Sequence, residues 1–267
     1  MLLKRIIASA IILLLVGLVI FYFPNWVFLL LTVFFIWLGL SEFFSIAEAR
    51  GIFVYKHFGI IAGCIIPLSI YLHLGENYIN LEPLLIVIAC LFTFVLQFVR
   101  RQNSHDHLVS IAITLLALFY ISWFFSFFIK LKFLPRGEWL VAFLVMVTKS
   151  GDVGAYFIGK SIGRHKLIPR ISPKKTVEGT IGGLISSVIV AFLCKGFLGL
   201  NVIHAIFVGM FFGVLGQVGD LAESLIKRDC GVKDAGSHFS GFGGILDIID
   251  SLLFTVPIFY YYVKLFL

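Results

Sequence analysis

Charged residues are scarce in this chain. Only 13% of its 267 residues are charged, whereas 60% are hydrophobic and 30 are phenylalanine. A soluble globular domain usually has about 25% charged and about 45–50% apolar residues, so it could not bury this much apolar surface. The composition therefore excludes an ordinary soluble protein and predicts a protein that exposes apolar surface to lipid.

Cysteine is rare as well. Of the 4 cysteines, Cys64, Cys90 and Cys194 lie inside apolar runs, and Cys230 lies in a polar stretch. Their spacing matches no metal-binding motif and suggests no disulfide pair, so we interpret them as small buried hydrophobic residues. The sequence also contains no internal repeat, which argues against a repeat architecture.

Long apolar runs follow one another along the chain and predict an all-α, polytopic integral membrane protein with about nine transmembrane helices. The first run follows Lys4 and Arg5 and is similar to a secretory signal. However, no small-residue cleavage site follows it and a second run begins directly after Pro24-Asn25, so we expect an uncleaved first span. The expected spans cover residues 6–23, 26–41, 57–73, 81–99, 109–129, 138–158, 180–198, 202–219 and 245–265.

The distribution of lysine and arginine predicts the orientation of these spans. With a cytoplasmic N-terminus, sixteen of the 21 Lys and Arg residues fall on the cytoplasmic side and five on the other side, as the positive-inside rule requires. The two most polar loops, 159–179 and 220–244, then share the cytoplasmic side. We expect a multi-pass protein of the cell inner membrane with an active site facing the cytoplasm. Because the net charge of +7 belongs mostly to such loops, we expect no nucleic-acid partner.

Acidic residues concentrate in the second half of the chain. Eight of the fourteen lie between residues 152 and 250, several at or within span ends. An acidic side chain near the middle of a membrane costs roughly 2.5–3.5 kcal/mol on insertion scales, so it is retained where it has a partner or a role. Spans one to five carry almost no such charge. We therefore expect residues 1–135 to be a scaffold and residues 136–267 to be the catalytic region of one integral domain.

Two blocks of polar residues suggest a site for a polyphosphate. The first runs from Lys149 to Lys160 and contains Asp152 between glycines. The second runs from Ile171 to Gly179, where we expect a helix that begins near Pro173 with Ser172 as its cap. Two lysines in the first turn would oppose the helix dipole, so they are placed for an anion such as a polyphosphate. The polar residues of this block are Ser172, Lys174, Lys175 and Thr176.

A third block suggests a site for a divalent cation. Asp220 and Glu223 are three residues apart and share a helix face with Ser224 and Lys227. Asp247, Asp250 and Ser251 repeat this spacing after a basic loop that contains glycine. Mg²⁺ is typically held by one or two carboxylates together with substrate phosphates.

From this block we predict Asp220 and Asp247 as the metal ligands, with Glu223 and Asp250 behind them. Basic residues of the same block would stabilise charge on phosphoryl oxygens; they are Lys227, Arg228 and Lys233. Spacing alone leaves open the alternative of solvated charges that flank a membrane helix.

The same residues resemble a known family. The run from Gly219 to Gly236 and the run from Gly243 to Ser251 closely resemble the C-terminal motif of phosphatidate cytidylyltransferases (CDP-diacylglycerol synthases). The stretches Asp152–Tyr156 and Ser172–Gly179 are similar to earlier motifs of that family, in the same order. The resemblance covers about residues 150–257.

This resemblance implies an integral-membrane enzyme, a homodimer, that condenses CTP with phosphatidate to give CDP-diacylglycerol and pyrophosphate. It implies a divalent metal such as Mg²⁺ on Asp220 and Asp247, with a monovalent cation such as K⁺ beside it. The candidate catalytic residues are Asp220, Asp247, Lys227, Arg228, Lys233 and Asp234. The candidate CTP- and phosphate-binding residues are Ser172, Lys174, Lys175, Thr176, Asp152, Glu223, Ser224, Gly243, Gly244 and Asp250.

The chain departs from the family pattern at four positions. Phe242 stands where the family has His, Ile248 where it has Arg, Ser240 where it has Pro and Val177 where it has Trp. These departures put the rate or the choice of substrate in doubt. The departures at Phe242 and Ile248 leave open a catalytically silent relative or a transporter with an acidic ion site. An alternative enzyme is a CTP-dependent polyprenol or phytol kinase, which also uses CTP, together with a membrane alcohol.

Overall fold

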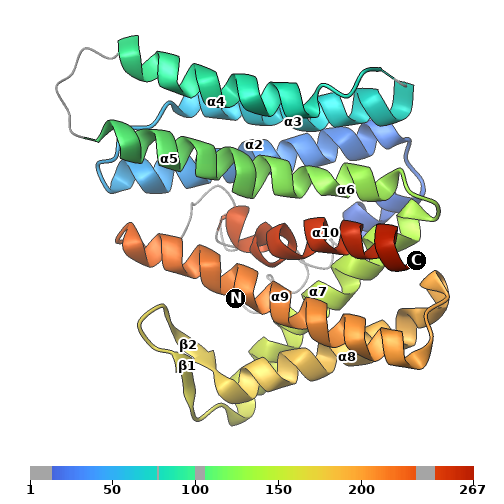
Figure 1. Cartoon of the computed structure of the whole chain (residues 1–267). Coiled ribbons are helices and arrows are strands. Elements are labelled where there is room, and N and C mark those ends of the chain that lie inside the picture. Colours follow the sequence, from blue (N-terminus) through green and yellow to red (C-terminus); the bar gives the residue numbers. More distant parts are fainter. Residues whose placement is uncertain (1–13, 77, 100–105, 233–243) are drawn as a thin grey trace. The chain divides into compact units, whose positions relative to one another are not determined.

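A computed structural model describes residues 14–76, 78–99, 106–232 and 244–267 (Figure 1). The chain packs into two compact units. The first unit consists of Met1–Phe133 and Cys230–Leu246, and the second of Leu134–Asp229 and Asp247–Leu267. The site residues that the structure describes belong to the second unit, except Gly244.

Among the described residues, eight helical segments are long and apolar enough to cross a membrane, which confirms an all-α polytopic membrane protein. Of the first expected span, 6–23, the structure describes a helical stretch at residues 14–21. The eight segments are α2 (Asn25–Ala49), α3 (Lys56–Glu76), α4 (Glu82–Val99), the continuous rod α5 (His107–Ala117), η1 (Leu118–Trp123) and α6 (Phe124–Lys132), then α7 (Gly137–Ile162), α8 (Val177–Leu198), α9 (Val202–Asp229) and α10 (Leu246–Phe266).

The first unit is a bundle in which α2, α3 and the rod α5–η1–α6 lie against one another (Figure 1). Leu29, Ile66, Ile70 and Ile129 form one apolar cluster of its core. The π-helical segment η1 interrupts the rod, and its Ser122 hydroxyl donates to the carbonyl of Gly63 at 2.5 Å. That bond gives the buried hydroxyl a partner. Lipid-embedded helices need such partners because no water is present to supply them.

The expectation that the first half is almost free of intramembrane charge was wrong. Glu42 lies inside α2 and is fully buried. Its two carboxylate oxygens accept the backbone N–H groups of Ile245 at 2.9 Å and Leu246 at 2.8 Å, within the same unit. The sequence-based span ended at residue 41, so it left Glu42 in a loop, whereas the helix continues for two more turns.

The second unit contains α7, α8, α9 and α10 with a small β-hairpin (Figure 1). Its helices pack closely because glycines face their neighbours. A Cβ atom on Gly154 of α7 would lie 2.0 Å from Ser186 Oγ of α8, and one on Gly219 of α9 would lie 2.5 Å from the backbone oxygen of Asp250 on α10. Small residues allow membrane helices to approach in this way, and here they bring polar positions of different helices together.

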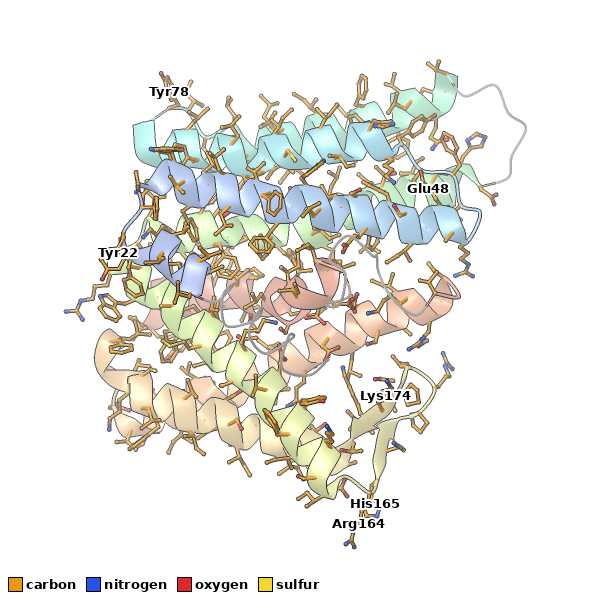
Figure 2. The ribbon with its side chains drawn as sticks, turned by 180° about the vertical axis from the view of Figure 1, so that it is seen from behind. Tyr22, Glu48, Tyr78, Arg164, His165 and Lys174 are labelled. Atoms are coloured by element: carbon orange, nitrogen blue, oxygen red, sulfur yellow. The ribbon has the colours of Figure 1, made fainter. Side chains whose placement is uncertain are left out.

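The hairpin corrects a second expectation. Ser172–Thr176 is not the start of a helix but strand β2, which pairs in antiparallel fashion with β1 (Lys166–Ile168). The helix begins at Val177, and Thr176 is its cap, with Oγ1 accepting the Gly179 N–H at 3.2 Å. Proline disfavours helical backbone at the residue before it, and strand pairing keeps the lysines that follow in an extended conformation. Figure 2 shows Arg164 and His165 near the end of α7 at the base of the hairpin, and Lys174 farther along it.

Candidate active site

Helix α9 carries the first part of the third block, from Asp220 to Arg228, and α10 carries Asp247, Asp250 and Ser251. Helix α9 continues to Asp229, ten residues beyond the expected end at residue 219, so Asp220, Glu223, Ser224 and Lys227 all belong to regular helix. Glu223 is 1% exposed, and Ser224 and Lys227 are also buried. Burial of charged groups in a membrane helix requires partners or a function.

Three carboxylates converge between α9 and α10. One oxygen each of Asp220, Glu223 and Asp250 lies within 4.8 Å of the others, close enough for a common metal ion. Glu223 and Asp250 are buried, and Asp220 is half-buried. The absence of a side chain on Gly219 permits this approach, because a Cβ atom there would collide with the backbone oxygen of Asp250.

Lys227 binds two of the neighbouring acids. Its ammonium group lies 2.5 Å from Glu223 Oε2 and forms an ion pair with Asp247 Oδ1. The sequence assigned Lys227 to phosphoryl oxygens and Asp247 to the metal. In the structure the two residues pair with each other, and Glu223 and Asp250 join Asp220 in the group of three. Metal binding by Asp220 and Asp247 stays a prediction.

A second polar network lies next to this group. Lys149 Nζ on α7 donates to Asp152 Oδ2 and to Ser251 Oγ, both at 2.8 Å. The Ser251 hydroxyl in turn donates to Asp152 Oδ2 at 2.9 Å, and the Ser251 N–H donates to Asp250 Oδ1 at 2.5 Å. Asp250 therefore links the Lys149 network to the group of three carboxylates.

A pocket of about 400 Å³ opens beside these residues. Acids line it from two helices, Asp152 on α7 and Asp220 on α9, and lysines line it from α7 and β2. Lys175 Nζ lies 2.7 Å from Asp220 Oδ2, so one pair of opposite charges already faces the pocket. The lining residues are Asp152, Ala155, Tyr156, Gly159, Lys160, Leu167, Lys174, Lys175, Thr176, Gly179, Thr180, Gln217, Asp220 and Leu221.

The remaining predicted residues fall into two sets. Arg228 Nε donates to the carbonyl of Ile171 at 3.1 Å and thus ties α9 to the hairpin, while Ser172 is half-buried in β2 and Gly244 is buried. Lys233, Asp234 and Gly243 lie outside the described residues, as do Ser240 and Phe242.

The group of three has the chemistry of a divalent-cation site. Glu223 Oε1 is buried and has no hydrogen-bond partner in the part of the chain that the structure describes. A buried carboxylate oxygen without a partner is costly, and a bound cation would supply one. Carboxylate oxygens are the ligands that Mg²⁺ prefers, so these residues fit the predicted metal.

Sequence reasoning missed three contributors. It noted Lys149 and Ser251 in their blocks but assigned neither to the site, because their contact joins positions 102 residues apart. It also overlooked Gln217, whose Nε2 donates to the carbonyl of Thr180 at 3.0 Å at the pocket wall. The available signal was its position three residues before Asp220, on the same helix face.

Comparisons with known proteins show similarity along most of the chain. The model of the cytidylyltransferase family matches residues 3–266. A phosphatidate cytidylyltransferase of Bacillus subtilis is 37% identical over 195 residues, which cover 72% of this chain and 71% of that protein. One from Synechocystis is 34% identical over 263 residues, covering 87% and 86%. The uncharacterized protein YnbB of Escherichia coli is 38% identical over 207 residues, covering 74% and 68%.

Proposed function

This chain belongs to the cytidylyltransferase family, and from that premise we propose that it condenses CTP with phosphatidate to form CDP-diacylglycerol and pyrophosphate. The observation that supports this most directly is the pocket in which Asp152 and Asp220 face Lys160, Lys174 and Lys175. A nucleoside triphosphate bound through a divalent cation needs both kinds of group, because carboxylates hold the metal and ammonium groups neutralise phosphate oxygens.

The lysines are suited to bind the triphosphate. Lys174 and Lys175 lie on β2 directly before the N-terminus of α8, where backbone N–H groups also favour an anion. Lys160 lies near the C-terminal end of α7 with its ammonium 5.7 Å from the Tyr156 ring centroid. Three cations on two elements can hold several phosphate oxygens at once and orient the α-phosphorus.

The carboxylates are suited to the metal. Asp220, Glu223 and Asp250 would hold it, and Asp247 would join them if Lys227 released it. When bound, a divalent cation neutralises charge on the phosphates and positions them. Lys227 keeps Glu223 and Asp247 close to each other through its two ion pairs.

The reaction needs alignment more than acid–base chemistry. A phosphate oxygen of phosphatidate attacks the α-phosphorus of CTP, the bond between the α-phosphorus and the bridging oxygen breaks, and pyrophosphate leaves with that oxygen. The attacking oxygen is already an anion, so no strong base is required. The side chains therefore act by holding two anions together and neutralising their charge.

The lipid substrate would reach the pocket from the bilayer. Tyr156 lines the pocket and is 53% exposed, and Phe157 next to it on α7 and Ile181 on α8 are also exposed. In a membrane-spanning helix such side chains face acyl chains. Orientation follows from the Lys and Arg distribution, so we infer that CTP enters from the cytoplasm at the inner membrane. From the resemblance to phosphatidate cytidylyltransferases we infer that the chain acts as a homodimer.

The test is turnover by the purified protein in sealed vesicles with Mg²⁺, labelled CTP and phosphatidate. We expect labelled CDP-lipid and pyrophosphate, formed when CTP is added on the cytoplasmic side, since CTP does not cross the bilayer. Free CDP with a phosphorylated long-chain alcohol, formed when polyprenol or phytol is supplied instead, would identify the alternative kinase. No turnover with either lipid would refute both enzymes.

A further inference from the structure

The ammonium group of Lys149 lies among oxygen atoms of α7 and α10. It contacts one carboxylate oxygen, of Asp152, and one hydroxyl oxygen, of Ser251, each at 2.8 Å. It also lies within electrostatic reach of Asp220 and Asp250. Oxygen atoms around a single positive charge are the surroundings that K⁺ takes in proteins. The ammonium group of a lysine, a +1 charge with three hydrogen-bond donors, meets the same oxygens.

The charges around the pocket support this view. The group of three and the ion pairs around it contain five carboxylates, of Asp152, Asp220, Glu223, Asp247 and Asp250, and three ammonium groups, of Lys149, Lys175 and Lys227. Lys160 and Lys174 also line the pocket and are assigned to the phosphate oxygens. With the five carboxylates and the three ammonium groups ionised, two negative charges remain, and one divalent cation would balance them. Without Lys149, three negative charges would remain, so a divalent cation would need one monovalent cation beside it.

The hydrogen bonds of Lys149 continue through Ser251 to both Asp152 and Asp250. Ser251 accepts from Lys149 and donates to Asp152, and its N–H donates to Asp250. Ser251 is fully buried and Asp250 is 5% exposed. A free ion at this place would have to displace the ammonium group of Lys149. That group is attached to the chain, so it loses no translational freedom when it binds these oxygens.

We propose that Lys149 is the resident monovalent cation of this site, so that the protein requires a divalent cation but no K⁺. This inference rests on the proposed function for the role of the divalent cation. Lys149 acts through Asp152, Ser251 and Asp250 and is thus a positioning residue: it keeps their oxygens oriented while the group of three binds the metal.

The first experiment uses the unmodified protein. Its thermal unfolding temperature and its turnover with Mg²⁺ are measured in Na⁺-free buffer containing either tetramethylammonium chloride or KCl at equal ionic strength. We expect both quantities to be the same in the two salts. A rise of several degrees, or a several-fold rise in turnover, caused by K⁺ would overturn the proposal without the use of any variant.

The second experiment replaces the cation. In tetramethylammonium chloride, Lys149→Met should unfold at a lower temperature and turn over about tenfold more slowly, because a carboxylate then loses its buried partner. KCl or NH₄Cl should raise its unfolding temperature and restore much of its turnover. Lys195→Met is the matched control, because Lys195 lies in the last turn of α8, where it packs on Phe192. This variant should behave as the unmodified protein in all three salts.

Loss of function in Lys149→Met without rescue by either salt would show a merely structural role and refute the proposal. The unfolding measurements need neither CTP nor lipid. They therefore separate this inference from the proposed function. If KCl raises the unfolding temperature of Lys149→Met while the unmodified protein makes no CDP-lipid, the inference about Lys149 is upheld and the proposed function is refuted.

Discussion

At the scale of residues, the buried charges of the second unit are arranged in pairs and triads across helices. Lys227 joins Glu223 of its own helix to Asp247 of α10, and Lys149 of α7 joins Asp152 to Ser251 of α10. Each lysine holds polar side chains that would repel one another or lose hydrogen bonds if it were absent. Removal of one partner from a buried ion pair is costly because the other charge stays buried.

Substitutions of the three converging carboxylates should identify the metal ligands. Asp220→Asn, Glu223→Gln and Asp250→Asn should each weaken the binding of Mn²⁺ by about 10–100-fold, as the loss of a residue at a metal site typically does. Electron paramagnetic resonance of free Mn²⁺ during a titration measures this. Glu178→Gln is a suitable control, because Glu178 binds His165 and the N–H of Arg164 instead.

The same titration tests the pair that the sequence predicted. If Asp220→Asn and Asp247→Asn weaken Mn²⁺ binding while Glu223→Gln and Asp250→Asn leave it unchanged, the sequence-based ligands are right and the group of three is not the metal site.

At the scale of elements, glycine contacts between helices decide where the polar side chains meet. The approach of α9 to α10 at Gly219 brings Asp220 beside Asp250. The hairpin adds lysines on β2 to the same pocket and is anchored at its base, where Glu178 accepts the N–H groups of Arg164 and His165. The close approach of the helix backbones therefore assembles the site before any ligand binds.

Gly219→Ala should separate these helices. The added Cβ atom would lie 2.5 Å from the backbone oxygen of Asp250, so α9 or α10 must shift, and a displacement of about 1 Å at an active site can lower turnover by about 100-fold. Turnover and unfolding temperature measure the effect. Gly196→Ala on α8 is the control, because no atom lies within 4 Å of its added Cβ; full activity of Gly219→Ala would contradict the role given to this contact.

At the scale of the whole molecule, two buried acids of the first unit have structural partners. Glu82 accepts bonds from Trp123 Nε1 and Lys130 Nζ, each at 2.6 Å. Glu42 accepts the N–H groups of Ile245 and Leu246, about two hundred positions further along the chain. All of these contacts lie within the first unit, so its buried acids stabilise contacts between segments that are distant in the sequence.

Glu42→Gln should therefore destabilise the protein. The amide keeps one carbonyl acceptor for two N–H donors and loses the charge, and a hydrogen bond to a charged group is worth about 1.5–3 kcal/mol. Thermal unfolding in detergent should show a clear decrease in midpoint. Glu48→Gln on the same helix is the matched control: Glu48 is exposed and pairs with Lys56 at 3.3 Å, a kind of contact worth about 0–1 kcal/mol. Equal midpoints for the two variants would contradict the importance of Glu42.

Much of this architecture could be predicted from the sequence. Apolar runs identified the eight described spans, because a helix must be apolar for the full thickness of the bilayer to be stable there. The helical spacing of Asp220, Glu223 and Lys227 also held, since it depends only on local geometry. The ends of α2 and α9 were placed too early, because hydropathy falls at the buried Glu42 and at the half-buried Asp220 although the backbone stays helical.

What the sequence by itself determined is the class of protein and the residues that could react, because hydropathy and local spacing act within single helices. Only the tertiary structure decided which of these residues meet. It paired Lys227 with Asp247, placed Glu223 and Asp250 beside Asp220, and brought Lys149 to Ser251. These contacts depend on which helix faces touch and how closely, and packing between segments far apart in the chain sets both.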